Sequence, residues 1–126
     1  MYEIGVSGQF EAAHRLVGDF GPATRLHGHT YRLDVVVRGE RLNDDGVLYD
    51  IGRLRAEIDG LTAALHYRDL GDVPGLSGVN TTAEAVARHC WDHLAPSLQG
   101  QGLTNLLVRV WESPQVYAAR DEALEP

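Results

Sequence analysis

The sequence predicts an α+β fold in which two helices cover one face of an antiparallel sheet, with the element order β-β-β-α-α-β-β. Apolar residues alternate with polar ones near both ends of the chain, and they recur at helical spacing in between. Strands that flank a pair of helices are typical of this fold class. The length of 126 residues fits a single domain, 1–126, which can bury a core without disulfides.

The first two strands are expected at residues 2–14 and 27–38, joined by a glycine-rich loop over residues 15–26. Alternation puts these residues on the apolar face of the first strand: Tyr2, Ile4, Val6, Phe10, Ala12 and His14. On the second strand the same face carries His27, His29, Tyr31, Leu33, Val35 and Val37. The two strands should pair as antiparallel neighbours. A turn at NDDG (residues 43–46) and a short third strand at VLY (residues 47–49) should follow.

Helical spacing of apolar residues predicts a first helix over residues 51–65, with Asp50 as its cap. A second helix should begin after Thr81 or Thr82, and its apolar stripe contains Cys90 and Trp91. The last two strands are expected at NLLVRVWES and QVYAAR, with Glu112 on the same face as Val108 and Val110. An open sheet of this kind has free edges, which favour oligomerisation.

Composition excludes several classes of function. The formal net charge is −7, all eleven basic residues are arginine, and no basic run is present, so nucleic acid is not an expected partner. No run approaches the roughly 20 apolar residues of a membrane span. The N-terminus lacks the features of a signal peptide, and one cysteine permits no internal disulfide. We therefore expect a cytoplasmic protein that contacts no membrane.

Three histidines form a candidate metal site. His27 and His29 are two residues apart on a strand, so their side chains point to the same face. His14 ends the neighbouring strand on its apolar face, and antiparallel pairing brings it to the same edge. Three imidazoles suit Zn²⁺, and three protein ligands with an open fourth position are typical of catalytic zinc. A pair of partly exposed strand histidines without metal is the alternative for HGH alone.

Five motifs, in order, resemble those of the 6-pyruvoyl-tetrahydropterin synthases and of the bacterial 6-carboxy-tetrahydropterin synthases of queuosine biosynthesis. They are FEAAH (10–14), RLHGHTY (25–31), YDIGRL (49–54), NTTAE (80–84) and VWESP (110–114). The resemblance implies a tunnelling fold (T-fold), assembled as a trimer or hexamer with active sites between subunits. It also implies that His14, His27 and His29 bind zinc. Glu112 would anchor a pterin ring, and Thr82 would be a second substrate-binding residue.

The chain departs from the family where the proton chemistry is expected. The family usually has a catalytic cysteine four residues before HGH, and this position is Ala23. The family also has Leu-Asp-His-x-x-Leu-Asn-Asp after the first helix, and the chain has LHYRDLGD (65–72). His66 and Tyr67 thus replace the aspartate and histidine of the relay. Cys90 cannot substitute for the missing base, because it is expected in the core. The resemblance leaves His66, Tyr67 and Asp69 as candidate catalytic residues.

Three functions fit these observations. The first is a zinc-dependent lyase that acts on the side chain of a dihydroneopterin-like pterin, by proton transfer or retro-aldol chemistry with a non-standard base. The second is a repurposed zinc enzyme that performs an aldol, cyclisation or isomerisation step on a non-pterin carbonyl compound. The third is a non-catalytic ligand-binding protein, which the retention of three metal ligands argues against. A retained pterin anchor at Glu112 favours the first.

Overall fold

Four long strands and one very short strand form a single twisted sheet. The computed structural model describes all residues, 1–126. The strands are β1 (Tyr2–His14), β2 (His27–Gly39), β3 (Arg68–Asp69), β4 (Asn105–Ser113) and β5 (Val116–Ala123), in the sheet order β3-β1-β2-β4-β5. Neighbouring strands are antiparallel except β3, which runs parallel to β1. The predicted α+β class and T-fold are confirmed.

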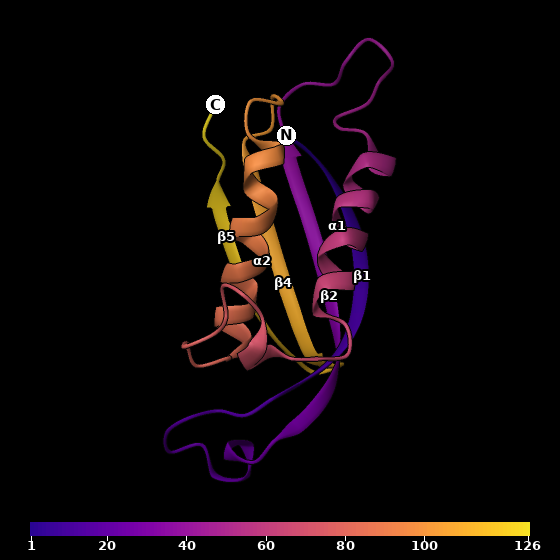
Figure 1. Cartoon of the computed structure of the whole chain (residues 1–126). Coiled ribbons are helices and arrows are strands. Elements are labelled where there is room, and N and C mark those ends of the chain that lie inside the picture. Colours follow the sequence, from indigo (N-terminus) through magenta and orange to yellow (C-terminus); the bar gives the residue numbers. More distant parts are fainter.

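Both helices lie on the same face of the sheet, as Figure 1 shows. They are α1 (Ile51–Leu65), which packs on β1, and α2 (Ala83–Leu98), which packs on β4 and β5. The carboxylate of Asp50 accepts hydrogen bonds from the backbone N–H groups of Gly52 and Arg53 and so caps α1. The hydroxyl of Thr82 accepts from Ala85 and caps α2. The predicted starts of both helices are therefore confirmed.

The core fills the space between the helices and the sheet. Its sheet side is built by the alternating residues predicted from the sequence, and Phe10 and Tyr31 stack there with ring centroids 4.8 Å apart. On α2, Cys90 is buried, and burial raises the pKa of its thiol to about 12. Trp91 is buried as well and donates from its indole nitrogen to the Leu106 carbonyl. Cys90 is thus a packing residue, as expected.

The expected strand at residues 47–49 is wrong. The Asn43 side chain accepts hydrogen bonds from the backbone of Asp45 and Val47, and the backbone N–H of Asn43 donates to the Val47 carbonyl. These local bonds hold the segment in a turn, so its backbone joins no sheet. The third strand is instead β3, after α1, and the observed order is β-β-α-β-α-β-β. A two-residue strand has no alternation from which it could be predicted.

The β1–β2 loop extends beyond the end of the sheet (Figure 1). It contains a short 3₁₀ helix, Gly21–Thr24, and it is fastened to the segment before α2. The Asn80 side chain both accepts from the N–H of Val17 and donates to its carbonyl.

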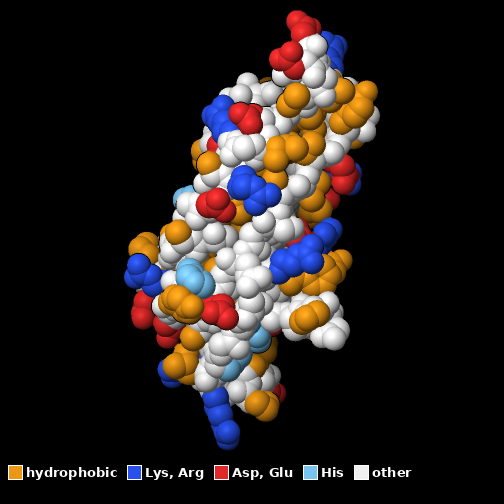
Figure 2. Space-filling view, turned by 90° about the vertical axis from the view of Figure 1, so that its right-hand side faces the viewer, with side chains coloured by type: hydrophobic (Ala, Val, Ile, Leu, Met, Phe, Trp, Pro, Cys, Tyr) orange, Lys and Arg blue, Asp and Glu red, His pale blue; other side chains and the backbone are white.

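No helix is long and apolar enough to cross a membrane. On the face drawn in Figure 2, acidic and basic side chains are interspersed and form no basic patch.

Candidate metal and ligand site

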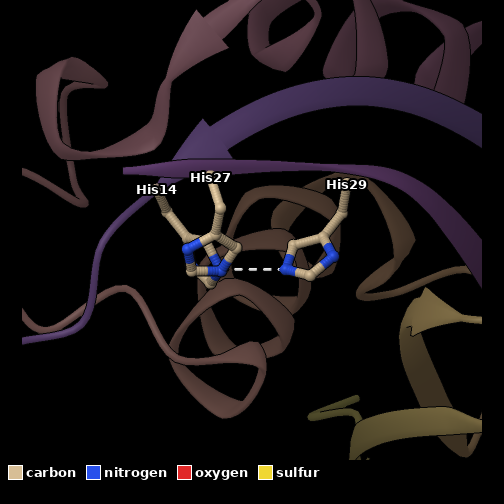
Figure 3. Close-up of side chains that lie close together, drawn as sticks. All are labelled: His14, His27 and His29. Atoms are coloured by element: carbon tan, nitrogen blue, oxygen red, sulfur yellow. Dashed lines mark hydrogen bonds between the residues drawn. The ribbon is translucent and has the colours of Figure 1, made fainter. Parts of the chain in front are cut away.

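Three histidine side chains converge where β1 ends and β2 begins. His14 and His27 are direct partners in the β1–β2 ladder, and His29 follows two residues later on the same face. One ring nitrogen from each lies within 4.8 Å of the others, and the Nε2 atoms of His14 and His29 are 3.2 Å apart. Figure 3 shows the three rings facing a common point. The convergence predicted from strand parity is therefore present.

Backbone carbonyls fix the orientation of two of the rings. The Nδ1 atom of His14 lies 2.7 Å from the Thr81 carbonyl, and that of His27 lies 2.7 Å from the Arg25 carbonyl. A carbonyl can only accept, so each Nδ1 carries a proton and each neutral ring keeps a lone pair on Nε2. This arrangement is typical of metal-binding histidines. Sequence reasoning did not find these carbonyls, because side-chain patterns carry no signal for them.

The local environment favours the neutral form of His29. Burial lowers the pKa of His29 below its ordinary value, and the neighbouring His14 and His27 act in the same direction. The Glu112 carboxylate acts in the opposite direction and does not outweigh them. His14 is almost fully buried, whereas His27 and His29 are half-buried. One side of the cluster therefore stays open to a ligand.

The spacing of His14 and His29 matches that of two ligands on one zinc ion. Tetrahedral zinc with Zn–N distances near 2.0–2.1 Å requires ligand nitrogens about 3.3 Å apart. The separation between the His14 and His29 Nε2 atoms is 3.2 Å. Three neutral imidazoles would leave one coordination position for a substrate oxygen or water. The donor set and the His14–His29 spacing thus suit a metal ion such as zinc.

Glu112 lies beside this cluster, and it is partly buried, as its face on the strand predicted. Its carboxylate oxygen Oε2 is 3.9 Å from Nε2 of His29, and its side chain is half-buried. The ladder between β4 and β5 shifts register between Trp111 and Ser113, so Glu112 occupies a β-bulge. Bulges are common next to functional sites, where they re-aim a side chain.

A polar network on the opposite face of the sheet holds the residue before this bulge. Asp34 accepts hydrogen bonds from Ser7 (2.7 Å), from Arg32 Nε (2.9 Å) and from Trp111 Nε1 (2.8 Å). The Trp111 ring also packs against Tyr117, with centroids 4.6 Å apart. Burial by itself raises the pKa of Asp34, but these hydrogen bonds outweigh it and lower the pKa. Sequence reasoning left Trp111 without a role and missed Asp34.

Tyr31 is a further polar group next to the histidines. Its ring makes edge contacts with His14 and His29, at centroid distances of 6.1 and 5.3 Å. Burial, and then the negative charge of Glu112, raise the pKa of its phenol well above the ordinary value. The hydroxyl is buried and has no hydrogen-bond partner in the chain. Alternation placed Tyr31 on the same face of the strand as His27 and His29. Nothing in the sequence predicted that its hydroxyl would lack a hydrogen-bond partner.

The candidate catalytic residues lie at the β1 edge, and no hydrogen bond joins them to the three histidines. Nδ1 of His66 accepts from the backbone N–H of Glu11 at 3.0 Å. Tyr67 has a φ of 56°, and its side chain is 78% exposed. The centroids of the Tyr67 and His66 rings are 3.9 Å apart. The Asp69 carboxylate accepts from the N–H of Gly71.

A hollow of about 540 Å³ lies between part of this edge and the start of β2, which carries His27 and His29. Tyr67 and Asp69 line it together with Glu11, Gly28, His29 and Thr30. His66 is outside it, beside α1. Ala23, where the family places a cysteine, lies in the 3₁₀ helix and makes only backbone hydrogen bonds, to Phe20 and Leu16. Tyr67 and Asp69 thus share a hollow with His29 but form no hydrogen bond with the three histidines.

Comparison with known proteins agrees with this geometry. The profile of the family described as "6-pyruvoyl tetrahydropterin synthase" matches residues 3–123. The chain is similar to the 6-carboxy-5,6,7,8-tetrahydropterin synthase of Synechocystis, with 39% identity over 83 residues, which is 62% of this chain and 63% of the relative. It is also similar to the dihydroneopterin monophosphate aldolase of Pyrococcus furiosus, with 32% identity over 91 residues, which is 72% of this chain and 73% of the relative.

A solved structure has the same fold. The 6-pyruvoyl tetrahydropterin synthase of Caenorhabditis elegans superimposes with a TM-score of 0.82 and 25% identity, over 96% of this chain and 95% of that one. The chain therefore belongs to the 6-pyruvoyl tetrahydropterin synthase family. The names of its relatives cover a synthase that forms a carboxypterin, a synthase that forms a pyruvoylpterin and an aldolase. Family membership thus supports a function in pterin chemistry and leaves the reaction open.

Proposed function

We propose that this protein is a zinc-dependent lyase that acts on the side chain of a dihydroneopterin-like pterin. The observation that carries the proposal is the placement of Glu112 beside a three-histidine cluster, with 3.9 Å between Glu112 Oε2 and His29 Nε2. An amino-pyrimidinone ring presents N–H donors, and a carboxylate is their natural acceptor. A pterin held by Glu112 would direct its side chain toward the histidines.

We assign separate roles in metal binding and substrate binding to the residues of the site. His14, His27 and His29 would hold Zn²⁺, which when bound supplies Lewis-acid polarisation of a side-chain oxygen. Glu112 would fix the ring, and Thr82, whose hydroxyl caps α2, would contact the substrate from the segment that holds His14. Ala23 cannot transfer a proton, so the base must come from another position.

His66, Tyr67 and Asp69 are the residues that we propose for proton transfer. They lie at an open sheet edge, and Tyr67 is largely exposed within one chain. A trimer or hexamer with sites between subunits would bring them to the metal cluster of a neighbouring chain. Histidine, tyrosine and aspartate side chains all serve as general acids or bases in enzymes. We expect the enzyme to work in the cytoplasm, where its single buried thiol stays reduced.

Loss of the usual base favours a reaction other than standard pyruvoyl- or carboxypterin synthesis. Retro-aldol cleavage of the pterin side chain requires different proton transfers from those of the synthases. The similarity to an aldolase supports this reaction. The second candidate is an enzyme of the same fold that acts on a non-pterin carbonyl compound. The changes at Ala23, His66 and Tyr67, with all metal ligands retained, favour this alternative only if pterins do not bind.

The metal assignment is tested by elemental analysis of purified protein. We expect close to one zinc per chain, and His27→Ala should abolish binding because it removes one of three ligands. His93→Ala is the matched control, since His93 is exposed on α2 and outside the cluster. Zinc content that survives replacement of all three histidines would refute the site.

The reaction is tested with dihydroneopterin, its monophosphate and its triphosphate, with products identified by mass spectrometry. We expect little pyruvoyl- or carboxypterin. Any turnover should fall sharply in the His66→Ala, Tyr67→Phe double variant. Glu112→Gln should weaken pterin binding by roughly 1.5–3 kcal/mol, the scale of a hydrogen bond to a charged group. Efficient standard synthase activity would contradict the first expectation, and full turnover by the double variant would contradict the second.

A further inference from the structure

We propose that Tyr31 is a positioning residue for ligand recognition, whose buried hydroxyl donates a hydrogen bond to the Glu112 carboxylate in the loaded site. The inference rests on the proposed function, because it assigns Glu112 to the ligand. Tyr31 itself would touch neither substrate nor metal. It would act by holding the carboxylate that does.

The sheet register places the two residues side by side. Tyr31 pairs with Phe10 on one side of β2. On the other side, the β2–β4 ladder ends with the pair Arg32 and Trp111, so Tyr31 and Glu112 each lie one residue beyond its last pair. Both side chains lie on the face that carries His29, because Tyr31 and His29 are two residues apart on one strand and Glu112 contacts His29. Tyr31 and Glu112 therefore lie on one face of the sheet, just beyond the end of the β2–β4 ladder.

The Tyr31 hydroxyl needs a partner that the free chain does not provide. The side chain has 0% exposure, and its oxygen has no hydrogen bond within the chain. A phenylalanine would stack on Phe10 equally well and would bury no unpaired polar group. Buried polar atoms without partners are rare in native proteins and destabilise them. The oxygen at this position therefore indicates a function beyond packing.

Metal binding would free the Glu112 carboxylate for this contact. In the free chain its nearest charged partner is Nε2 of His29, at 3.9 Å. An Nε2 atom that binds a metal carries no proton, so it cannot also donate to a carboxylate. Rotation of the carboxylate toward Tyr31 then gives both groups a hydrogen bond. The remaining carboxylate lone pairs stay available to the N–H groups of a ligand.

The test compares Tyr31→Phe with the parent protein, both loaded with zinc. Neopterin is the probe, since its own fluorescence reports binding without turnover. We expect about tenfold weaker binding, as for loss of one hydrogen bond to a charged group. We also expect unchanged zinc content and an unfolding temperature that is equal or higher, because an unpaired hydroxyl has been removed. The pairing with Glu112 is tested by a double-mutant cycle, in which Tyr31→Phe should have no further effect on binding in the Glu112→Gln background.

Tyr49→Phe is the matched control. The Tyr49 side chain is also buried, but its hydroxyl already contacts Glu57 at 3.4 Å, far along the chain from the histidines. This variant should not gain stability, and its neopterin affinity should be unchanged. Equal neopterin affinity in Tyr31→Phe and the parent would overturn the inference. So would weaker binding that comes with lost zinc or a lower unfolding temperature, or a loss that persists fully in the Glu112→Gln background. Failure of the parent to bind neopterin would instead overturn the proposed function, and the inference with it.

Discussion

Asp34 shows how one buried charge supports a site on the other side of a sheet. It is 7% exposed, and its oxygens accept from Ser7, Arg32 and Trp111 on the face opposite the helices. Arg109 contributes a further contact at 3.4 Å. A carboxylate that is surrounded by donors is stabilised in its charged form. The hydrogen bond to Trp111 also fixes the strand residue that precedes Glu112.

This environment predicts a pH-dependent contribution to stability. The pKa of Asp34 is lower in the folded chain than in the unfolded one, so its contribution is complete above the ordinary pKa of about 3.9. The contribution is lost as the pH falls through the lowered value. Asp34→Asn should therefore lower the free energy of unfolding at pH 7 by roughly 1.5–3 kcal/mol. The difference from the parent should shrink below about pH 4 in denaturant titrations. A difference that stays constant from pH 7 to pH 2 would show that the charge is not its cause.

At the scale of elements, helix α1 begins where a side chain replaces missing backbone partners. Asp50 accepts from Gly52 at 2.9 Å and from Arg53 at 3.3 Å. Asp50→Ala should destabilise the protein by about 1 kcal/mol, the usual effect of a lost N-cap. Guanidinium unfolding at fixed protein concentration measures this change. Asp50→Ser retains an acceptor and should recover most of the loss. Equal stability of the alanine and serine variants would exclude capping as the cause.

How far the sequence predicts each element depends on how local its determinants are. Alternation over residues 2–14 and 27–38 predicted two strands, and their pairing placed His14 opposite His27. Capping residues gave the starts of both helices. The turn at NDDG was predicted, but the strand expected after it is absent, because side-chain to backbone bonds of Asn43 hold residues 43–47 in the turn. Strand β3 was not predicted, because it depends on contact with a distant strand.

In the site, too, the residues with a local sequence pattern could be predicted, and the contacts between distant segments could not. His14, His27, His29 and Glu112 could be placed together from strand parity and family motifs. The carbonyls of Arg25 and Thr81, which orient two ligands, carry no side-chain signal. The Asp34–Trp111 contact joins residues 77 positions apart, so only the folded sheet reveals it.

At the scale of the whole molecule, the sheet has two edges available for pairing. Only Ala12 and Ala13 of β1 are paired with β3, and β5 has no neighbour beyond it. Val116 and Tyr117, where β5 begins, are more than half exposed. Long open edges with apolar residues pair readily with another chain. We therefore expect a trimer or hexamer in solution.

Light scattering during size-exclusion chromatography checks this expectation. The mass should be three or six times 13.8 kDa and should persist on dilution to micromolar concentration. A stable monomer at that concentration would contradict the assembly. It would also remove the means by which His66, Tyr67 and Asp69 of one chain reach the metal cluster of another.

All three candidate metal ligands lie within residues 14–29, and this has a consequence for biosynthesis. Contacts between residues close in sequence form faster than distant ones. During translation, the β1–β2 hairpin emerges long before Glu112 on β4, so the nascent chain has its complete set of imidazoles while the ligand pocket is still unfinished. The three imidazoles are therefore present in the chain before the Thr81 carbonyl that orients His14 and before Glu112.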